Sequence, residues 1–307
     1  MPLTFATRPS ALARWQTAHV IQLLQAAYPG LECTEDVITT TGDRLLDRPL
    51  PEIGGKGLFT SELEKALLTG NVQAAVHSLK DLPIEESPGL VIAAIPEREA
   101  AQDVLVSAAG QRLMDLPEGA RVGTSSIRRA AQLLARRPDL AILPLRGNVD
   151  SRLRKVWNGE YDAIVLAQAG LLRLGLQAHI SEVFPLEVML PAPGQGALAV
   201  QCRADDEETQ RLLAAIHHPL TAAAVEAERA FLSGLGGGCS LPVAAFAQKN
   251  NGTIILTGAV ISPDGKQEIR LSAADADQDP QKLGQRLADL VLERGAAELL
   301  KASVQIG

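Results

Sequence analysis

The chain has 307 residues, of which 46% are hydrophobic and 21% are charged, and its formal net charge is −7 at pH 7. This length predicts two or three domains, and the apolar content excludes a chain that stays disordered. Only 3% of the residues are aromatic. Together with the acidic balance, this disfavours a protein that binds nucleic acid.

The sequence also disfavours membrane proteins and secreted proteins. No apolar run reaches the roughly 18 residues of a membrane-spanning helix, and the N-terminal segment lacks the basic start and apolar core of a signal peptide. Three widely spaced cysteines are typical of a reducing compartment. We therefore expect a cytoplasmic protein, and we expect no metal site because CxxC and HExxH are both absent.

Predicted helices and strands alternate as far as residue 190. Ser61 and Glu64 form a predicted capping box for the second helix. The alternation predicts an α/β fold with mainly parallel sheets. In chain order the elements are a helix over 11–27, a strand over 35–40, a helix over 62–68, a strand over 72–76, a strand ending at 123, a helix over 127–135, a strand over 141–145, a helix over 149–157, a strand over 162–167 and a helix from 170.

The pattern changes after a Pro- and Gly-rich cluster at 191–196, which is a candidate hinge or crossover. A predicted helix over 221–232 leads to a glycine-rich loop. The remainder reads as β-like runs at 243–247, 253–260 and 268–272 and a final helix over about 280–300. This predicts a small α+β domain at the C-terminus.

An arginine-rich block spans residues 121–155, where eight arginines and one lysine face only two aspartates. The block carries a charge of +7, so the rest of the chain carries −14. Arginine rather than lysine indicates bidentate recognition of carboxylate or phosphate. For Arg136 and Arg137, a solvated helix face is the simpler interpretation.

One anion site is predicted at the start of the helix over 127–135. Thr124 and Ser126 supply capping hydroxyls, and Arg128 and Arg129 lie in the first turn. Unpaired N–H groups and the helix dipole add positive charge there. The alternative is an ordinary capped helix with exposed arginines.

A second candidate follows the strand over 141–145. Arg146 lies at the strand end where α/β folds bind ligands, and Gly147 allows a tight turn. Arg152 falls on the next helix. A surface role for both arginines stays open.

Three further segments could carry chemistry. Lys80 and Asp81 follow a buried strand, where a carboxylate could stabilise a cation or move a proton; a surface turn is equally consistent. The run 54–57 fails the P-loop pattern and predicts a flexible lid with one lysine. Cys239, in a loop of glycines, is a candidate nucleophile or attachment point.

Taken together, these motifs resemble those of the porphobilinogen deaminase family over nearly the whole chain. The order and spacing of the matches are highly specific, although Pro9, Arg14 and Glu52 depart from the family's pattern. The matching segments are 6–13, 54–59, 75–83, 122–129, 145–149, 193–196, 228–229 and 237–239.

The resemblance implies two α/β lobes like those of periplasmic binding proteins, with the site in the cleft between them. A small α+β domain would carry the cofactor. The implied domains are residues 1–98 with 194–216, residues 99–193, and residues 217–307. The first domain would thus be discontinuous.

The resemblance also implies an activity. The family joins four porphobilinogen molecules head to tail, with release of ammonia, to give linear hydroxymethylbilane in tetrapyrrole biosynthesis. A dipyrromethane cofactor, held through a thioether at the position of Cys239, primes this chain. The implied partners are porphobilinogen and the growing oligopyrrole, and we expect a cytoplasmic monomer that binds neither nucleic acid nor membrane.

Individual roles follow from the same resemblance. Asp81 matches the catalytic aspartate, which contacts pyrrole N–H groups and stabilises the azafulvene cation. The acetate and propionate of each pyrrole account for the arginines. Positions matching cofactor-binding residues are Lys80, Asp81, Thr124, Ser126, Arg128, Arg129, Arg146, Gly147 and Cys239. Positions matching substrate-binding residues are Arg8, Ser10, Arg146, Arg152, Arg173 and Gln195.

Two other classes of protein compete with this interpretation. A non-enzymatic anion-binding protein of the periplasmic type would share an arginine-lined cleft, but the missing signal peptide and the loop cysteine disfavour it. A regulator that binds an acidic ligand or acts with nucleic acid is disfavoured by the acidic remainder of the chain. A covalent pyrrole adduct would separate the enzyme from the first of these.

Overall fold

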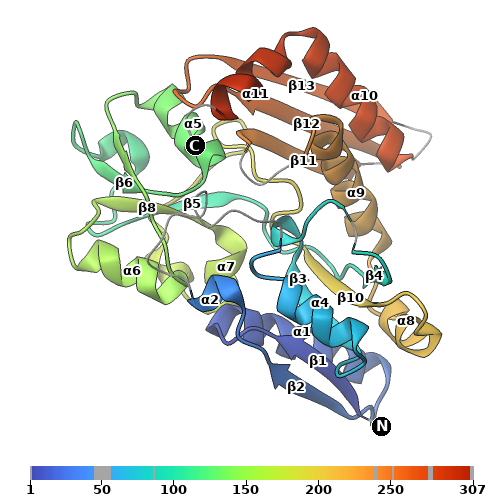
Figure 1. The fold of residues 1–307 in the computed structure, drawn as a ribbon. Coiled ribbons are helices and arrows are strands. Elements are labelled where there is room, and N and C mark those ends of the chain that lie inside the picture. The colour runs from blue at the N-terminus through green and yellow to red at the C-terminus, as the bar shows by residue number, and fades with distance from the viewer. Residues whose placement is uncertain are drawn as a thin grey trace. The chain divides into compact units, whose positions relative to one another are not determined.

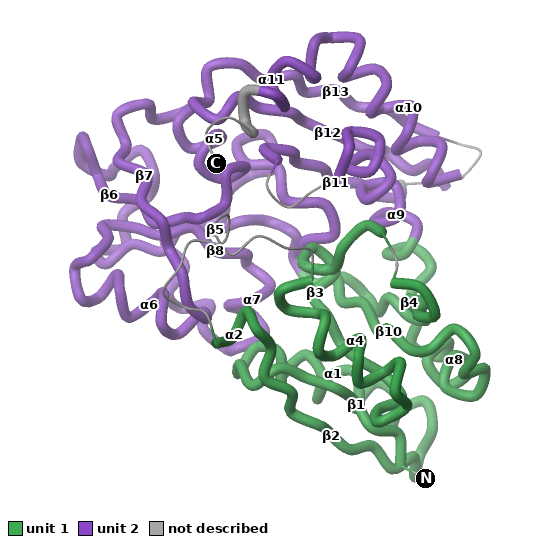
Figure 2. Tube along the Cα trace, in the orientation of Figure 1, with its two compact units in different colours: residues 1–99, 196–222 green, residues 100–195, 223–307 purple. Residues whose placement is uncertain are grey.

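A computed structural model describes residues 2–44, 57–85, 87–237, 241–250, 252–275 and 279–304. The chain divides into two compact units, residues 1–99 with 196–222 and residues 100–195 with 223–307 (Figure 2). Each unit therefore combines segments that are distant in sequence. The finer division into three domains stays a prediction, because the second unit holds both an α/β sheet and the C-terminal sheet.

The first unit is built on a five-stranded sheet with the order β2-β1-β3-β10-β4 (Figure 1). Its elements are β1 (Leu3–Thr7), α1 (Ala11–Ala27), β2 (Cys33–Val37), α2 (Thr41–Arg44), α4 (Ser61–Leu68), β3 (Ala74–Ser78), the 3-10 helix η1 (Leu79–Asp81), β4 (Leu90–Ala94), β10 (Leu198–Arg203) and α8 (Glu207–Ala214). β10 is antiparallel to both of its neighbours, and the other strands run in one direction.

Two helices cover opposite faces of this sheet. Phe5 packs with Val20 of α1, whereas the adjacent Ala6 packs with Leu63 of α4. Successive side chains of a strand point to opposite faces, so α1 and α4 lie on different sides. The side chains of both cores are buried. The strands β1 and β3 belong to these cores, and the candidate site residues Arg8, Lys80 and Asp81 follow their C-terminal ends.

The second unit begins with a sheet of the same plan, in the order β7-β6-β8-β5-β9. Its elements are β5 (Asp103–Ser107), the 3-10 helix η2 (Leu113–Asp115), β6 (Arg121–Gly123), α5 (Ile127–Arg136), β7 (Ala141–Leu143), α6 (Val149–Trp157), β8 (Ala163–Ala167), α7 (Gln168–Arg173), the 3-10 helix η3 (Gln177–His179) and β9 (Glu182–Val183). The fourth strand, β5, is again the antiparallel one. The chain passes from the first unit to the second after residue 99 and returns after residue 195. β5 and β10 are the first strands that follow these two passages.

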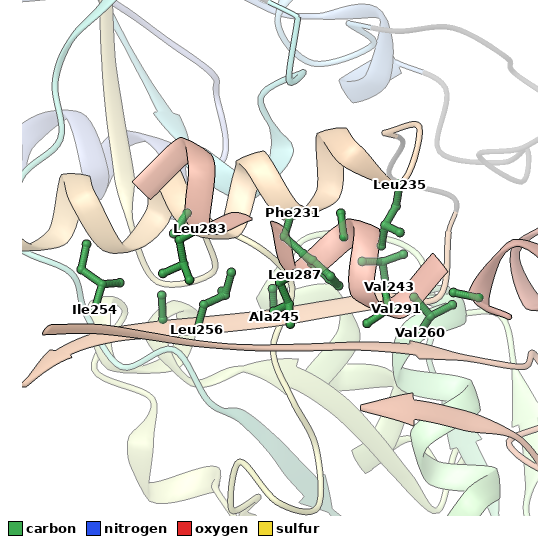
Figure 3. Close-up of a cluster of buried hydrophobic side chains, with 14 of the residues drawn as sticks. Phe231, Leu235, Val243, Ala245, Ile254, Leu256, Val260, Leu283, Leu287 and Val291 are labelled. Atoms are coloured by element: carbon green, nitrogen blue, oxygen red, sulfur yellow. The ribbon is translucent and has the colours of Figure 1, made fainter. Parts of the chain in front are cut away.

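The C-terminal part of this unit is a three-stranded antiparallel sheet covered by helices (Figure 3). Its elements are α9 (Pro219–Gly234), β11 (Val243–Asn250), β12 (Thr253–Ile261), β13 (Glu268–Asp275), α10 (Pro280–Glu293) and α11 (Ala296–Val304). Phe231 of α9 and Leu287 of α10 are fully buried against Leu256 of β12. The predicted classes, an α/β fold and a small α+β C-terminal part, are thus confirmed.

Several predicted boundaries hold, and others are wrong; the strand predicted over 72–76, for example, spans Ala74–Ser78. The helices over 11–27 and 149–157 begin and end as predicted. The strand predicted over 35–40 is shifted to Cys33–Val37, where it pairs with β1. The capping box is wrong because Thr60 precedes α4 and the Ser61 hydroxyl donates to Gly57 O at 2.8 Å. The final helix is interrupted at Gly295, whose φ of +95° ends α10.

Within the described ranges, no helix is both long enough and apolar enough to cross a bilayer.

Candidate functional site

Arg8 lies just after β1 and is held by an ion pair and an aromatic ring. Its guanidinium donates from Nε to Asp43 Oδ2 at 3.2 Å and from Nη2 to Asp43 Oδ1, and its Cζ lies 4.3 Å from the centre of the Phe59 ring. Burial alone would raise the pKa of Asp43, but hydrogen bonds from Arg8 and Thr40 outweigh it and lower the pKa. Arg8 is therefore oriented before any ligand arrives.

The segment after β3 presents Lys80 and Asp81 at the end of a buried strand, as predicted. The turn of η1 buries Leu79 completely, leaves Lys80 half-buried and exposes Asp81. Ser10, a predicted substrate ligand, accepts the Ala13 N–H at 3.2 Å as the N-cap of α1. This bond uses the oxygen of the Ser10 hydroxyl and not its hydrogen.

His77, three residues before Lys80, is only 6% exposed. Burial lowers the pKa of its imidazole from 6.5 to about 4; the Gln201 side chain opposes this and Arg8 reinforces it. The folded protein therefore keeps His77 neutral over a pH range in which the unfolded chain is protonated. Stability that depends on His77 is present above pH 6.5 and is lost as the pH falls towards 4.

We expect the free energy of unfolding to fall by about 3 kcal/mol over that window because of His77, at about 1.4 kcal/mol per pKa unit. In His77→Gln this dependence should flatten, whereas His179→Gln, at an exposed position, should keep the wild-type slope. Urea unfolding at several pH values measures it. Equal slopes in all three proteins would contradict a neutral buried His77.

In the second unit, the residues of the first predicted anion site lie at the start of α5. Ser126 is the N-cap and accepts the Arg129 N–H at 3.4 Å. Thr124 Oγ1 accepts the Ser126 N–H at 3.1 Å. Both hydroxyl groups use their oxygens as acceptors in these bonds, at a helix end whose dipole is already positive.

The start of α6 lies beside that of α5. Ser125 joins the two loops, since its Oγ accepts the Leu145 N–H at 3.0 Å and donates to Leu145 O at 2.9 Å. Asn148 caps α6 by accepting the Ser151 N–H at 3.0 Å. Two helix N-termini thus meet at the carboxyl ends of the parallel strands β6 and β7.

Arg146 and Gly147 lie in the loop before α6, and Arg152 lies in the first turn of that helix. Gly147 has a φ of +108°, a conformation that favours glycine. Arg152 donates from Nε to Gly147 O at 2.7 Å, so this arginine folds back over the loop. Arg146 and Arg152 are both half-buried. The bonds of Ser125 to Leu145 thus place the loop that carries Arg146 and Gly147 beside the loop that carries Thr124 and Ser126; their role in binding stays a prediction.

Arg128 and Arg129 point inwards and share one carboxylate, that of Asp103. Arg128 Nη1 donates to Asp103 Oδ2, and Arg129 Nη2 to Asp103 Oδ1, each at 2.7 Å. Asp103 is fully buried, which alone would raise its pKa, but the two guanidinium groups outweigh this and lower the pKa strongly. Two guanidinium groups share one carboxylate, so the first turn of α5 keeps a net positive charge.

Two other predicted substrate ligands are buried as well. Gln195 donates from Nε2 to Asp103 Oδ1 at 2.9 Å and to Ala101 O at 2.7 Å. Arg173 ends α7 and is 8% exposed. Asp103 is therefore the centre of a cluster that includes three of the predicted binding residues.

Some predictions fall on residues outside the described ranges. These are Cys239, the candidate attachment residue, and residues 54–56 of the glycine-rich segment. Among the residues that are described, no three histidine, cysteine or acidic side chains form a group that could hold a metal ion.

Sequence reasoning did not single out the acidic partners of these arginines. Asp103 opens a strand of apolar residues, and a charged residue in such a position is seldom buried unless it is paired. The charged residue at the start of this apolar strand was therefore a signal in the sequence that Asp103 is paired. Asp43 has no comparable signal, because its pairing with Arg8 depends on the turn of α2.

Glu228 lies in one of the segments that match the family, and its partners here are backbone groups. It is fully buried, and its carboxylate accepts the backbone N–H groups of Gly194 at 2.7 Å and Ala247 at 2.8 Å. It thus fixes the loop that presents Gln195.

Two family models match the chain in succession. One, described as porphobilinogen deaminase, dipyromethane cofactor binding domain, matches residues 3–211, and the other, described as porphobilinogen deaminase, C-terminal domain, matches residues 222–293. Curated relatives named porphobilinogen deaminase are 49% identical in Maridesulfovibrio salexigens, over 97% of both chains, and 51% identical in Moorella thermoacetica, over 96% of this chain and 94% of the relative.

Solved structures give weaker likenesses. The VFT2 domain of BvgS from Bordetella pertussis is 18% identical with a TM-score of 0.43, over 70% of this chain and 85% of that one. A putative periplasmic sulfonate-binding protein from Methylobacillus flagellatus is 11% identical with a TM-score of 0.39, over 75% of this chain and 67% of that one. At these TM-scores, neither likeness supports a conclusion about this chain.

Proposed function

This chain belongs to the porphobilinogen deaminase family, and we propose which of its residues carry out the reaction that defines the family. The enzyme is a transferase of tetrapyrrole biosynthesis. It joins four porphobilinogen molecules head to tail, releases ammonia, and forms linear hydroxymethylbilane. A dipyrromethane cofactor, when bound, supplies the pyrrole carbon to which the first substrate is joined.

The paired N-termini of α5 and α6 are the observation that carries the assignment of binding residues. Substrate, cofactor and product all bear acetate and propionate groups, so the site must hold several carboxylates. Two positive helix ends, joined by Ser125 and flanked by the half-buried Arg146 and Arg152, fit such a set of anions. We assign cofactor and substrate carboxylates to this place, with Thr124 and Ser126 as hydroxyl donors.

Arg128 and Arg129 would act at the same end of α5. Their bonds to Asp103 hold them at the base of the helix, where their excess positive charge attracts carboxylates. Gln195 belongs to this buried layer and keeps Asp103 in place. Arg173 is assigned a substrate-side role by its match to the family.

Asp81 is the proposed catalytic residue. When ammonia leaves porphobilinogen, a cation forms on the substrate, and a carboxylate near it stabilises that cation and can take or return a proton. Asp81 stands exposed at the end of η1, on a turn anchored by the buried Leu79. Lys80 beside it, with Arg8 and Ser10 in the same unit, is assigned to substrate carboxylates.

Cys239 is the proposed attachment point of the cofactor. We expect the denatured wild-type protein to exceed its sequence mass by two pyrrole units, and Cys239→Ser to lack this excess, because a thioether survives denaturation. Intact-mass spectrometry measures it.

Cys33→Ser is the matched control and should keep the adduct. Burial raises the pKa of the Cys33 thiol, which makes it a poorer nucleophile at neutral pH. An adduct that persists in Cys239→Ser would move the attachment elsewhere. An unmodified wild-type protein that stays unmodified after incubation with porphobilinogen would contradict the proposed cofactor chemistry.

We also propose that the enzyme acts as a cytoplasmic monomer and binds neither nucleic acid nor membrane. The acidic net charge and the small number of aromatic residues support this. Its substrate and product are polar small molecules, which need neither partner.

A further inference from the structure

The turn between β12 and β13 rests directly on α5, the helix whose first turn carries Ser126, Arg128 and Arg129. We propose that Gly265, at the tip of this turn, is a positioning residue that holds α5 and thereby its anion-binding end. The inference rests on the function proposed above for α5. It assigns to the C-terminal sheet a second task besides carrying the cofactor loop.

The contact at Gly265 is made between backbones. A Cβ added at this residue would lie 2.5 Å from Ala131 O and 2.4 Å from the backbone nitrogen of Ala135. No ordinary carbon contact is that short, and helix backbone cannot move aside as a flexible side chain can. Gly265 also has a φ of +74°. Only glycine therefore satisfies both the turn and the approach.

Hydrogen bonds within the turn hold its conformation. The Ser262 hydroxyl donates to Asp264 Oδ1 at 2.6 Å and accepts the Gln267 N–H at 3.0 Å. The Gly265 N–H donates to Ser262 O at 2.8 Å. Because these bonds hold the turn, an atom added at Gly265 would displace α5 rather than the turn.

Buried apolar contacts join the same two elements below the tip. Ile261 of β12 and Ala131 of α5 belong to one fully buried cluster, which also contains Leu190. The main chain of Leu190 is held by α5, since its N–H donates to Gln132 Oε1 at 2.7 Å and its carbonyl accepts from Gln132 Nε2 at 3.0 Å. Contacts with β12 and with Leu190 thus fix the position of α5.

Leu190 also connects the contact to the arginine pair. Its carbonyl accepts from Arg128 Nη1 at 2.7 Å, the same nitrogen that donates to Asp103. A shift of α5 at Ala131 would therefore strain these two hydrogen bonds of Arg128 Nη1 and displace Arg128 from Asp103. Because α5 has only ten residues, Ser126 at its N-cap would move with it.

The sequence offers a matched pair of variants. Gly252, in the neighbouring turn between β11 and β12, has a φ of +85°, and a Cβ there meets nothing within 4 Å. Gly252→Ala and Gly265→Ala therefore share the cost of a positive φ, and only Gly265→Ala presses on α5. A difference between them isolates the contact from the backbone conformation.

The experiment measures kcat and KM for porphobilinogen and cofactor occupancy by intact mass, at a temperature at which each variant is folded by circular dichroism. We expect kcat/KM of Gly265→Ala to fall roughly tenfold or more, mainly through KM, or cofactor occupancy to fall, since displacements near 1 Å cost up to about a hundredfold. Gly252→Ala should stay within about twofold of wild type. Equal values for the two variants would overturn the inference.

Two further variants complete the test. Ile261→Ala trims the same contact without adding an atom, and it should raise KM in the same direction if Gly265→Ala does not fold; an unchanged KM would then overturn the inference. Ser126→Ala tests the anion-binding end itself. If Ser126→Ala raises KM and Gly265→Ala does not, only the positioning role fails; if neither does, the proposed function of α5 fails with it.

Discussion

Asp81→Asn is expected to abolish elongation while leaving the fold intact. The carboxylate is exposed at the end of η1, and the turn is anchored by Leu79 rather than by Asp81. Loss of its charge should therefore change stability by less than about 0.5 kcal/mol. Removal of a group that stabilises a cation or moves a proton should slow the reaction about 10²- to 10⁴-fold. Hydroxymethylbilane formation and a thermal melt measure the two effects.

Asp115 provides the matched control for Asp81. It ends η2 (Leu113–Asp115) as Asp81 ends η1, it is also exposed, and the residue two before it, Leu113, is likewise buried. Asp115→Asn should retain the wild-type rate. Near-normal turnover of Asp81→Asn would remove Asp81 from the mechanism, and equal losses in the two variants would indicate a general effect of charge.

Asp103→Asn is expected to cause the largest loss of stability. Asp103 is fully buried and receives hydrogen bonds from Arg128, Arg129 and Gln195. Its removal leaves two buried guanidinium groups without a counter-charge, and breaking a buried pair in this way costs about 3–5 kcal/mol. Urea unfolding measures the loss, and activity should fall as well because α5 loses its anchor.

The pH dependence gives a second readout for Asp103. Because the pKa of its carboxyl is lowered in the folded protein, its contribution to stability is present at neutral pH and is lost as the pH falls below the ordinary value of 3.8. This acid sensitivity should be reduced in Asp103→Asn.

Asp139→Asn is the control for the second prediction. Asp139 also pairs with an arginine, Arg137, at 2.7 Å, but both side chains lie nearer the surface, where ion pairs contribute little. Its loss should be much smaller. Equal losses for the two aspartates would contradict a special role for the buried cluster.

Local sequence signals determined much of the secondary structure. Helices α1, α5 and α6 start where Ser10, Ser126 and Asn148 supply capping oxygens, and such caps act within three residues of themselves. The strands β1 and β10 were not predicted. Their partners lie far along the chain, as when Ala199 of β10 pairs with His77 of β3, and no local pattern encodes such a register.

The candidate site divides in the same way. Motifs and charge by themselves placed Lys80, Asp81 and Arg146 at strand ends and Thr124 and Ser126 at a helix start, because residue type and short spacing suffice for that. Only the tertiary structure decided that Arg128 and Arg129 turn inwards to Asp103, 25 and 26 residues away. Burial of a charge requires a partner, and which residue becomes that partner depends on how the strands assemble.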